Sequence, residues 1–193
     1  MKTLKLFIFV VVLGGLTAGL ITGMDVLTAE RIKENANYEW KSAMLEHHGL
    51  STGVNVYADL FEETFTTNDT DKLPRERVYR HKELGTYSFY FSGGGIWGEI
   101  NGVITLDNDG ITIIKVTVLN QQETPGLGGL VSTRDYLDNY VGKKFNPTLT
   151  LLKPNSGLDP ATEVDQITGA TGTSNRFILM LNTIYQEKMG DLL

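Results

Sequence analysis

The chain lacks cysteine altogether, and this absence excludes several classes of chemistry. Disulfides, thiolate zinc sites, iron-sulfur clusters and a cysteine nucleophile all require cysteine side chains. Histidine is scarce as well, because the chain has only His47, His48 and His81, and we expect no histidine-rich metal or haem site. His47 and His48 point to different faces of a helix, and we expect them to end a solvated helix. Any redox chemistry therefore has to come from a bound organic cofactor.

Positive charge is in deficit beyond the first five residues. The chain of 193 residues has 17 basic and 23 acidic residues, and Lys2 and Lys5 are two of the basic ones, which leaves 15 basic residues elsewhere. Such a surface repels the phosphates of nucleic acid, so we expect no nucleic-acid partner. The length and the hydrophobic fraction of 41% are typical of one globular domain plus an anchor.

Charge is absent from residues 6–24, LFIFVVVLGGLTAGLITGM. An apolar run of roughly 20 residues is long enough to cross a bilayer as a helix. A cleaved signal peptide is the alternative, but the run exceeds the usual ~7–15-residue core and no clean Ala-x-Ala site follows it. We therefore expect residues 1–25 to form a single-pass transmembrane anchor in the inner or plasma membrane. Because Lys2 and Lys5 should stay in the cytoplasm, we expect the rest of the chain to be extracytoplasmic.

The part of the chain beyond the anchor divides by pattern into a helical segment and a sheet-rich domain. Residues 26–48 favour a helical stalk that ends at Gly49. Residues 54–75 are polar and threonine-rich without a clear period, which is typical of loops. We therefore assign residues 26–76 to a helical stalk and loop-rich segment, and residues 77–193 to the globular domain.

The globular domain is predicted to be α+β, with an antiparallel sheet and packed helices. Short β-prone runs between residues 87 and 119 form a meander, and Asn108-Asp109-Gly110 marks a hairpin turn within it. Residues 133–141 have helical spacing, and residues 174–189 have a broad apolar face that should pack on the sheet.

The segment at residues 165–174, DQITGATGTS, combines two glycines and four hydroxyls immediately before the last predicted helix. Free backbone N-H groups at a helix N-terminus and the positive end of the helix can hold a phosphate, and glycines remove steric obstruction. Taken alone, the segment has a simpler interpretation, in which Thr173 or Ser174 caps the helix. It is not a Walker loop, because no lysine follows the second glycine.

A second turn at residues 123–128, ETPGLG, has an equally readable pattern. Proline followed by glycine predicts a type II turn, because proline fixes one φ and glycine permits the positive one. The Gly128-Gly129 pair allows the backbone to come close to a planar ligand. As an isolated feature this turn would be structural.

Together the two segments resemble the FMN-binding domain family. Residues 165–171 resemble its flavinylation motif, and residues 123–128 resemble its ETPGLG segment. The family is found in the G subunit of Rnf complexes and in the C subunit of sodium-pumping NADH:quinone oxidoreductase. There a separate extracytoplasmic flavin transferase joins FMN through its phosphate to the last threonine of the motif. The resemblance therefore implies covalent FMN on Thr171.

The resemblance also implies a set of cofactor-binding residues, with no catalytic or metal-binding residues. Glu123 and Thr124 are expected as polar partners of the flavin ring, and Trp97, in a predicted strand, either stacks on flavin or belongs to the core. Relatives often have histidine where Gln121 stands, so no proton transfer is assigned there. The expected cofactor-binding residues are Trp97, Glu123, Thr124, Pro125, Gly126, Leu127, Gly128, Asp165, Thr168, Gly169, Ala170, Thr171, Gly172 and Thr173.

The implied function is an electron relay within a membrane complex. Tethering retains FMN outside the cytoplasm, and no residue set for binding NADH or a second cofactor is present, so other membrane subunits must supply and remove electrons. The resemblance implies an ion-translocating oxidoreductase of the Rnf, ferredoxin:NAD type, which the short length favours. The C subunit of the NADH:quinone oxidoreductase is an alternative. A membrane-anchored, non-redox binding or assembly module is an alternative of another class.

Overall fold

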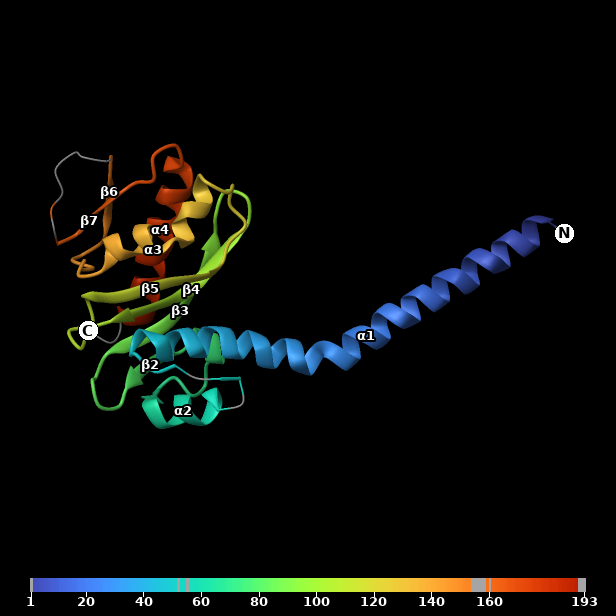
Figure 1. Ribbon diagram of the computed structural model, residues 1–193, viewed down its shortest axis with the longest axis horizontal. Helices are drawn as coiled ribbons and strands as arrows, with labels where there is room; N and C mark the ends of the chain where they lie inside the picture. Colours follow the sequence, from blue (N-terminus) through green and yellow to red (C-terminus); the bar gives the residue numbers. More distant parts are fainter. Residues whose placement is uncertain (1, 52, 55, 154–158, 160, 191–193) are drawn as a thin grey trace. The chain divides into compact units, whose positions relative to one another are not determined.

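The computed structural model describes residues 2–51, 53–54, 56–153, 159 and 161–190 (Figure 1). The chain divides into two compact units, Met1–Tyr38 and Glu39–Leu193.

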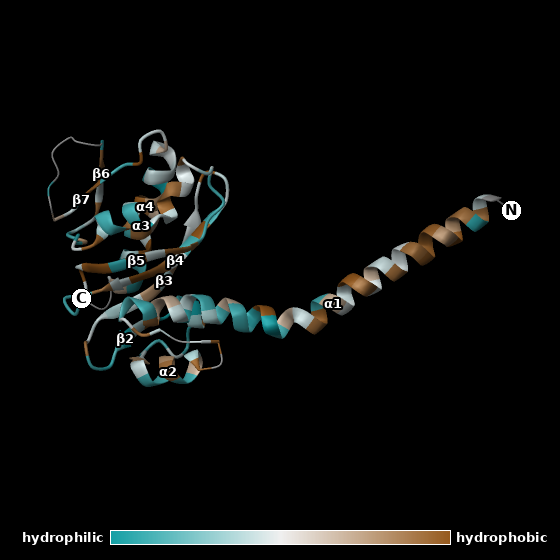
Figure 2. Ribbon diagram, in the orientation of Figure 1, coloured by the Kyte–Doolittle hydropathy of each residue, from teal (hydrophilic) through white to brown (hydrophobic). Residues whose placement is uncertain are grey.

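Helix α1 (Lys2–His47) forms the first unit and continues into the second. The predicted anchor and stalk are one helix, because no proline interrupts these residues and isolated glycines do not break a helix. Its N-terminal part is long and apolar enough to cross a membrane (Figure 2). The apolar side chains there are exposed. The helix ends as predicted at Gly49, which has a φ of +75°, and the Leu50 N-H donates to the Leu45 carbonyl at 3.0 Å.

The second unit is built on a five-stranded antiparallel sheet in the order β1-β2-β3-β4-β5. The predicted meander is confirmed, and Gly110, with a φ of +72°, lies in the turn between its last two strands. The strands are β1 (Phe65–Thr66), β2 (Val78–His81), β3 (Tyr87–Gly94), β4 (Glu99–Leu106) and β5 (Ile113–Asn120).

Helices α3 (Arg134–Leu137) and α4 (Thr171–Met189) lie on one face of the sheet (Figure 1). The apolar side of α4 is buried there as predicted, and the ring of Phe177 packs edge-on against Phe91 at 5.9 Å. The helix begins at Thr171 rather than at residue 174, with Ala170 as N-cap, so neither Thr173 nor Ser174 caps it.

Short elements complete this side of the unit. They are the 3-10 turns Gly128–Ser132 and Asp138–Tyr140 and a parallel pair of strands, β6 (Thr150–Leu152) and β7 (Glu163–Asp165). Strand β7 was not expected, and it leads directly into the segment that precedes α4.

The last turns of α1 and helix α2 (Tyr57–Thr64) pack on the opposite face of the sheet. Trp40 is fully buried, with ring centroids 5.6 Å from both Phe61 and Tyr79. Helix α2 replaces part of the loop expected at residues 54–75. These buried aromatic residues join the last turns of α1 and helix α2 to the sheet within the second compact unit.

The expectation that His47 and His48 end a solvated helix is wrong. The His47 ring is buried, and its Nδ1 and Nε2 atoms lie 2.8 and 2.9 Å from the hydroxyls of Thr105 and Thr117. Burial, with a smaller effect from Lys115, lowers the pKa of His47 to about 3. His48 is partly buried, with Nε2 2.8 Å from the Thr86 hydroxyl. The last turn of α1 therefore packs against the sheet through both histidines.

Candidate functional site

Two turns that are distant in the sequence meet at the N-terminus of α4. Residues from the 123–128 turn and from the 165–174 segment line one cavity of about 280 Å³, together with the loop between β3 and β4. The lining residues are Ile96, Trp97, Glu123, Thr124, Leu127, Gly128, Gly169, Ala170, Thr171, Gly172 and Thr173. The fold thus joins the two motifs into a single site.

Thr171 occupies a distinctive place among the four hydroxyls of the 165–174 segment. It is the first residue of α4, its side chain lines the cavity, and its hydroxyl has no hydrogen bond within the residues that the structure describes. The hydroxyls of Thr173 and Ser174 are buried and donate to Glu123 and to a backbone carbonyl. Thr168 is exposed but does not line the cavity. Thr171 is therefore the hydroxyl of this segment that is available for reaction at the cavity.

Glu123 joins three segments of the site by hydrogen bonds. One carboxylate oxygen, Oε1, accepts hydrogen bonds from the backbone N-H groups of Ile96 at 2.7 Å and Trp97 at 2.9 Å. The other, Oε2, accepts the hydroxyl of Thr173 at 2.5 Å. The residue is only 5% exposed. Glu123 thus has a structural role in the site, and its expected contact with the flavin ring stays a prediction, since the residue also lines the cavity.

These hydrogen bonds also determine the charge of Glu123. Burial by itself raises the pKa of this carboxyl, but the donated hydrogen bonds from Thr173, Trp97 and Ile96 outweigh burial and lower the pKa, with a smaller contribution from Arg176. The site therefore contains a buried carboxylate that is ionised at neutral pH.

Glycines allow the three segments to approach one another. A Cβ atom on Gly172 would lie 3.2 Å from the Cδ1 atom of Ile96, and one on Gly169, which has a φ of +80°, would lie 3.2 Å from the Leu127 side chain. A Cβ atom on Gly128 would lie 2.6 Å from the Thr173 hydroxyl. At Gly128 the absence of a side chain therefore lets the backbone approach Thr173, and the expected approach of a planar ligand stays a prediction.

The 123–128 turn has the predicted conformation. Gly126 has a φ of +73°, and the Leu127 N-H donates to the Thr124 carbonyl at 3.1 Å, as in a type II turn. Gln121 supports this turn, because its side-chain oxygen accepts the Glu123 N-H at 2.6 Å. Gln121 thus has a structural role in the position where relatives often carry histidine.

Most of the predicted cofactor-binding residues line the cavity, but four do not. Pro125 and Gly126 form the exposed tip of their turn, Thr168 is exposed outside the cavity, and Asp165 lies at the end of β7. One oxygen of Asp165 is buried without a hydrogen-bond partner among the described residues. Ile96 was missed, although it adjoins Trp97 in the glycine-rich stretch that the sequence displays.

Trp97 belongs neither to a strand nor to the core. It lies in the turn between β3 and β4, which the Gly95 N-H closes by donating to the Gly98 carbonyl at 2.7 Å. The side chain is 70% exposed beside the cavity. An indole in this place is free to cover a planar ligand, because Glu123 fixes its backbone while most of the residue is exposed.

The donors at the cavity fit a phosphate ester on Thr171. The backbone N-H groups of Thr171, Gly172 and Thr173 have no hydrogen-bond partner in the part of the chain that the structure describes, and they lie at the positive end of a helix of 19 residues. The exposed apolar side chains of Ile96 and Leu127 border the same cavity. The site therefore combines phosphate donors with apolar surface for a ring.

Comparison with known proteins connects this site to a family. Residues 95–186 match the family described as FMN-binding domain. The sequence is 34% identical over 88 residues to the C subunit of the Na(+)-translocating NADH-quinone reductase of Vibrio alginolyticus, a match that covers 43% of this chain and 34% of that protein. The chain thus spans about a third of the length of this relative.

Two solved structures have the same fold. The C subunit of the Na(+)-translocating NADH-quinone reductase of Parabacteroides distasonis superposes with a TM-score of 0.63 and 22% sequence identity, covering 80% of this chain and 92% of that one. Shewanella oneidensis NqrC superposes with a TM-score of 0.66 and 18% identity, covering 83% of this chain and 95% of that one. These matches establish the α+β fold of the sheet-containing unit.

Proposed function

Since residues 95–186 of this chain belong to the FMN-binding domain family, we propose that the chain carries FMN covalently on Thr171 and passes electrons within a membrane oxidoreductase complex. The single observation that carries this proposal is the position of the Thr171 hydroxyl. It is exposed, without a hydrogen bond among the described residues, and placed at the N-terminus of α4 in the cavity where both motifs meet.

The attachment forms one bond and releases one proton. The oxygen of the Thr171 hydroxyl attacks the phosphorus of an activated flavin nucleotide supplied by a separate flavin transferase, the hydroxyl proton is lost, and the activating group leaves. The N-H groups of the first turn of α4 then hold the ester oxygens, which favours the phosphate end of FMN at this place. Thr173 cannot substitute, because its hydroxyl is buried and bonded to Glu123.

The remaining cavity residues position the ring and exclude water. Trp97 and Leu127 supply apolar cover, and Glu123 keeps the loop that carries Trp97 against the start of α4. Flavin, when bound, accepts one or two electrons, and its potential depends on the hydrogen bonds and charges around it. The ionised Glu123 carboxylate is the charge that this chain places beside the site.

The proposed setting is the outer side of a bacterial inner membrane. The apolar N-terminal helix is compatible with an anchor, and Lys2 and Lys5 favour a cytoplasmic N-terminus. Other membrane subunits would donate and accept the electrons in an ion-translocating complex. The Rnf complex is the first proposed setting, and the NADH-quinone reductase, to which the relative from Vibrio alginolyticus belongs, is the alternative.

Flavin attachment tests the proposal directly. The full chain is co-expressed with a flavin transferase, and denatured samples are viewed under ultraviolet light in a gel. The wild-type band and the Thr171→Ser variant, which keeps a hydroxyl, should fluoresce, whereas Thr171→Ala should not. Thr183→Ala is the matched control, because it removes an exposed hydroxyl of the same helix outside both the motif and the cavity, and it should retain the fluorescence.

The outcomes also separate the alternatives. A dark wild-type band in a host with active transferase would refute the flavin relay and favour a non-redox binding or assembly module. Co-purification of the native complex separates the two redox settings, because one should reduce quinone with NADH and the other should exchange electrons between ferredoxin and NAD.

A further inference from the structure

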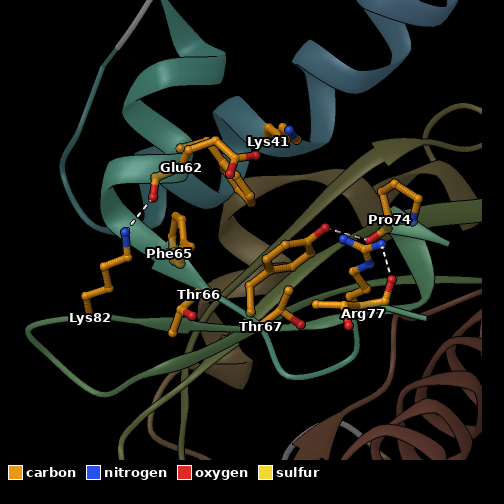
Figure 3. Close-up of a pocket in the computed structure, with 11 residues that line it drawn as sticks. Lys41, Glu62, Phe65, Thr66, Thr67, Pro74, Arg77 and Lys82 are labelled. Atoms are coloured by element: carbon orange, nitrogen blue, oxygen red, sulfur yellow. Dashed lines mark hydrogen bonds between the residues drawn. The ribbon is translucent and has the colours of Figure 1, made fainter. Parts of the chain in front are cut away.

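A second cavity, of about 420 Å³, lies on the face of the sheet opposite α4 (Figure 3). The last turns of α1, helix α2, and strands β1 and β2 with the loop between them form its walls. This volume is in the range of sites for small molecules. Neither of the two sequence motifs reaches the cavity, so the flavin site does not account for it.

Cationic side chains predominate around this cavity. Lys41, Arg77 and Lys82 line it, and Glu62 is the one acidic residue in its described lining. The chain as a whole has a net charge of −6, so an excess of positive charge in this place is a local feature. A cavity with this balance favours an anionic ligand.

Lys41 carries the least compensated of these charges. Its side chain is partly buried, and its ammonium group has no hydrogen bond or ion pair within 4.0 Å among the described residues. It lies 4.7 Å from the ring centroid of Phe61, a cation-π distance. Burial lowers the pKa of Lys41, and the more distant carboxylate of Glu62 only partly offsets this effect. The fold therefore withdraws this ammonium group partly from water, with no bonded carboxylate among the described residues.

Arg77 and Lys82 are held in place by backbone carbonyls. The Nε and one terminal nitrogen of Arg77 donate to the backbone carbonyls of Lys72 and Thr70 at 2.8 and 2.9 Å. The Lys82 ammonium donates to the Glu62 carbonyl at 2.6 Å (Figure 3). These bonds orient the cations without neutralising them. A guanidinium has five N-H donors, so Arg77 keeps donors for an oxyanion.

We propose that this cavity binds a soluble, small phosphate monoester that carries an aromatic or other flat apolar group. The phosphate oxygens would accept hydrogen bonds from Lys41 and Arg77, which match the charge and geometry of a phosphate. The apolar group would lie against the aromatic walls that Phe61, Phe65 and Tyr79 supply. This site is separate from the flavin site, and the proposal does not depend on flavin attachment.

Phenyl phosphate is a suitable probe, because it joins a phosphate monoester to one ring. Its binding to the full chain in neutral detergent is measured by isothermal titration calorimetry. Inorganic phosphate is the control that lacks the ring, and benzyl alcohol is the control that lacks the charge. Phenyl phosphate should bind more tightly than either, and its affinity should fall as salt concentration rises. Lys41→Met, which keeps the apolar stem, should weaken it by about tenfold or more, while Lys41→Arg should retain it.

The control variant is Lys144→Met, which removes an exposed lysine outside the cavity and should leave the affinity unchanged. Arg77→Gln is a second test and should also weaken binding, provided that its circular dichroism spectrum matches that of the wild type. Equal affinities in Lys41→Met, Arg77→Gln and the wild type would overturn the proposal. If inorganic phosphate bound as tightly as phenyl phosphate, the proposal that the ligand carries an aromatic or flat apolar group would be overturned. Binding to vesicles containing phosphatidic acid, with none to phenyl phosphate, would overturn the assignment to a soluble ligand.

Discussion

Replacing Glu123 tests how strongly one side chain holds the flavin site together. Alanine at this position leaves two backbone N-H groups, those of Ile96 and Trp97, and the buried Thr173 hydroxyl without their acceptor. Each unsatisfied buried group costs ~1–3 kcal/mol, and because the three share one partner we expect a combined loss of about 3–5 kcal/mol in the free energy of unfolding. Glutamine keeps the shape and an acceptor oxygen but loses the charge, so its expected loss is about 1–2 kcal/mol.

Urea unfolding of the full chain in neutral detergent measures these losses. Fluorescence of the buried Trp40 reports the unfolding of the sheet-containing unit. Glu83→Gln is the matched control, since Glu83 is exposed, and it should change the stability by no more than about 0.5 kcal/mol. A stability of Glu123→Ala within the range of this control would refute the structural role of Glu123.

The dependence of the free energy of unfolding on pH also tests the role assigned to Glu123. The pKa of Glu123 is lowered in the folded protein from its ordinary value of 4.5, so the stabilisation is fully present above that value. It is lost as the pH falls through the lower, folded-state pKa. The difference in stability between wild type and Glu123→Gln should therefore be constant above about pH 4.5 and shrink below it. A difference that does not change with pH would contradict the assignment of an ionised carboxylate.

Three further predictions follow from particular residues. The folded-state pKa of His47 is about 3 against an ordinary value of 6.5, so the unfolded state binds the proton first and His47 alone should cost the wild type about 2 kcal/mol of stability between pH 7 and pH 5. Urea unfolding of His47→Gln should show a correspondingly smaller loss, although not a zero one, because burial also lowers the pKa values of His48 and His81; a loss equal to that of the wild type would contradict this prediction. Gly169→Ala and Gly142→Ala place a side chain at φ values of +80° and +79°, and each should lower the free energy of unfolding by ~1–2 kcal/mol. Only Gly169→Ala should reduce in-gel flavin fluorescence, because its Cβ meets Leu127 beside the cavity. Equal fluorescence of the two variants would contradict this prediction. Trp97→Ala should change the free energy of unfolding by no more than about 0.5 kcal/mol, because Trp97 is 70% exposed. It should nevertheless shift the visible absorption of the attached flavin. An unchanged spectrum would exclude contact between Trp97 and the flavin ring.

Features that depend on neighbouring residues could be predicted from the sequence. The helix end at Gly49, the hairpin at Gly110 and the type II turn at Gly126 all require a positive φ, and the glycines mark them. The meander of β3, β4 and β5 was equally predictable, because each strand is a short β-prone run next to a turn signal.

Features that depend on distant partners could not be predicted. The structural role of Glu123 could not be predicted, because nothing near it in the sequence indicates that its carboxylate accepts hydrogen bonds from residues 26, 27 and 50 positions away. His47 appeared solvated for the same reason, since Thr105 and Thr117 bury it from strands far along the chain. A polar residue whose partners come from another part of the fold has no periodic pattern by which its environment can be recognised.

The central claim is the ester between FMN and Thr171, and the intact mass of the purified full chain tests it most directly. Wild-type chain from cells that contain the flavin transferase should exceed the sum of its residues by one FMN less one water, and peptide mapping should locate the addition on Thr171. Thr171→Ala from the same cells should weigh only what its residues sum to. A wild-type mass equal to that of its residues, or an FMN-sized addition that persists in Thr171→Ala, would contradict the account.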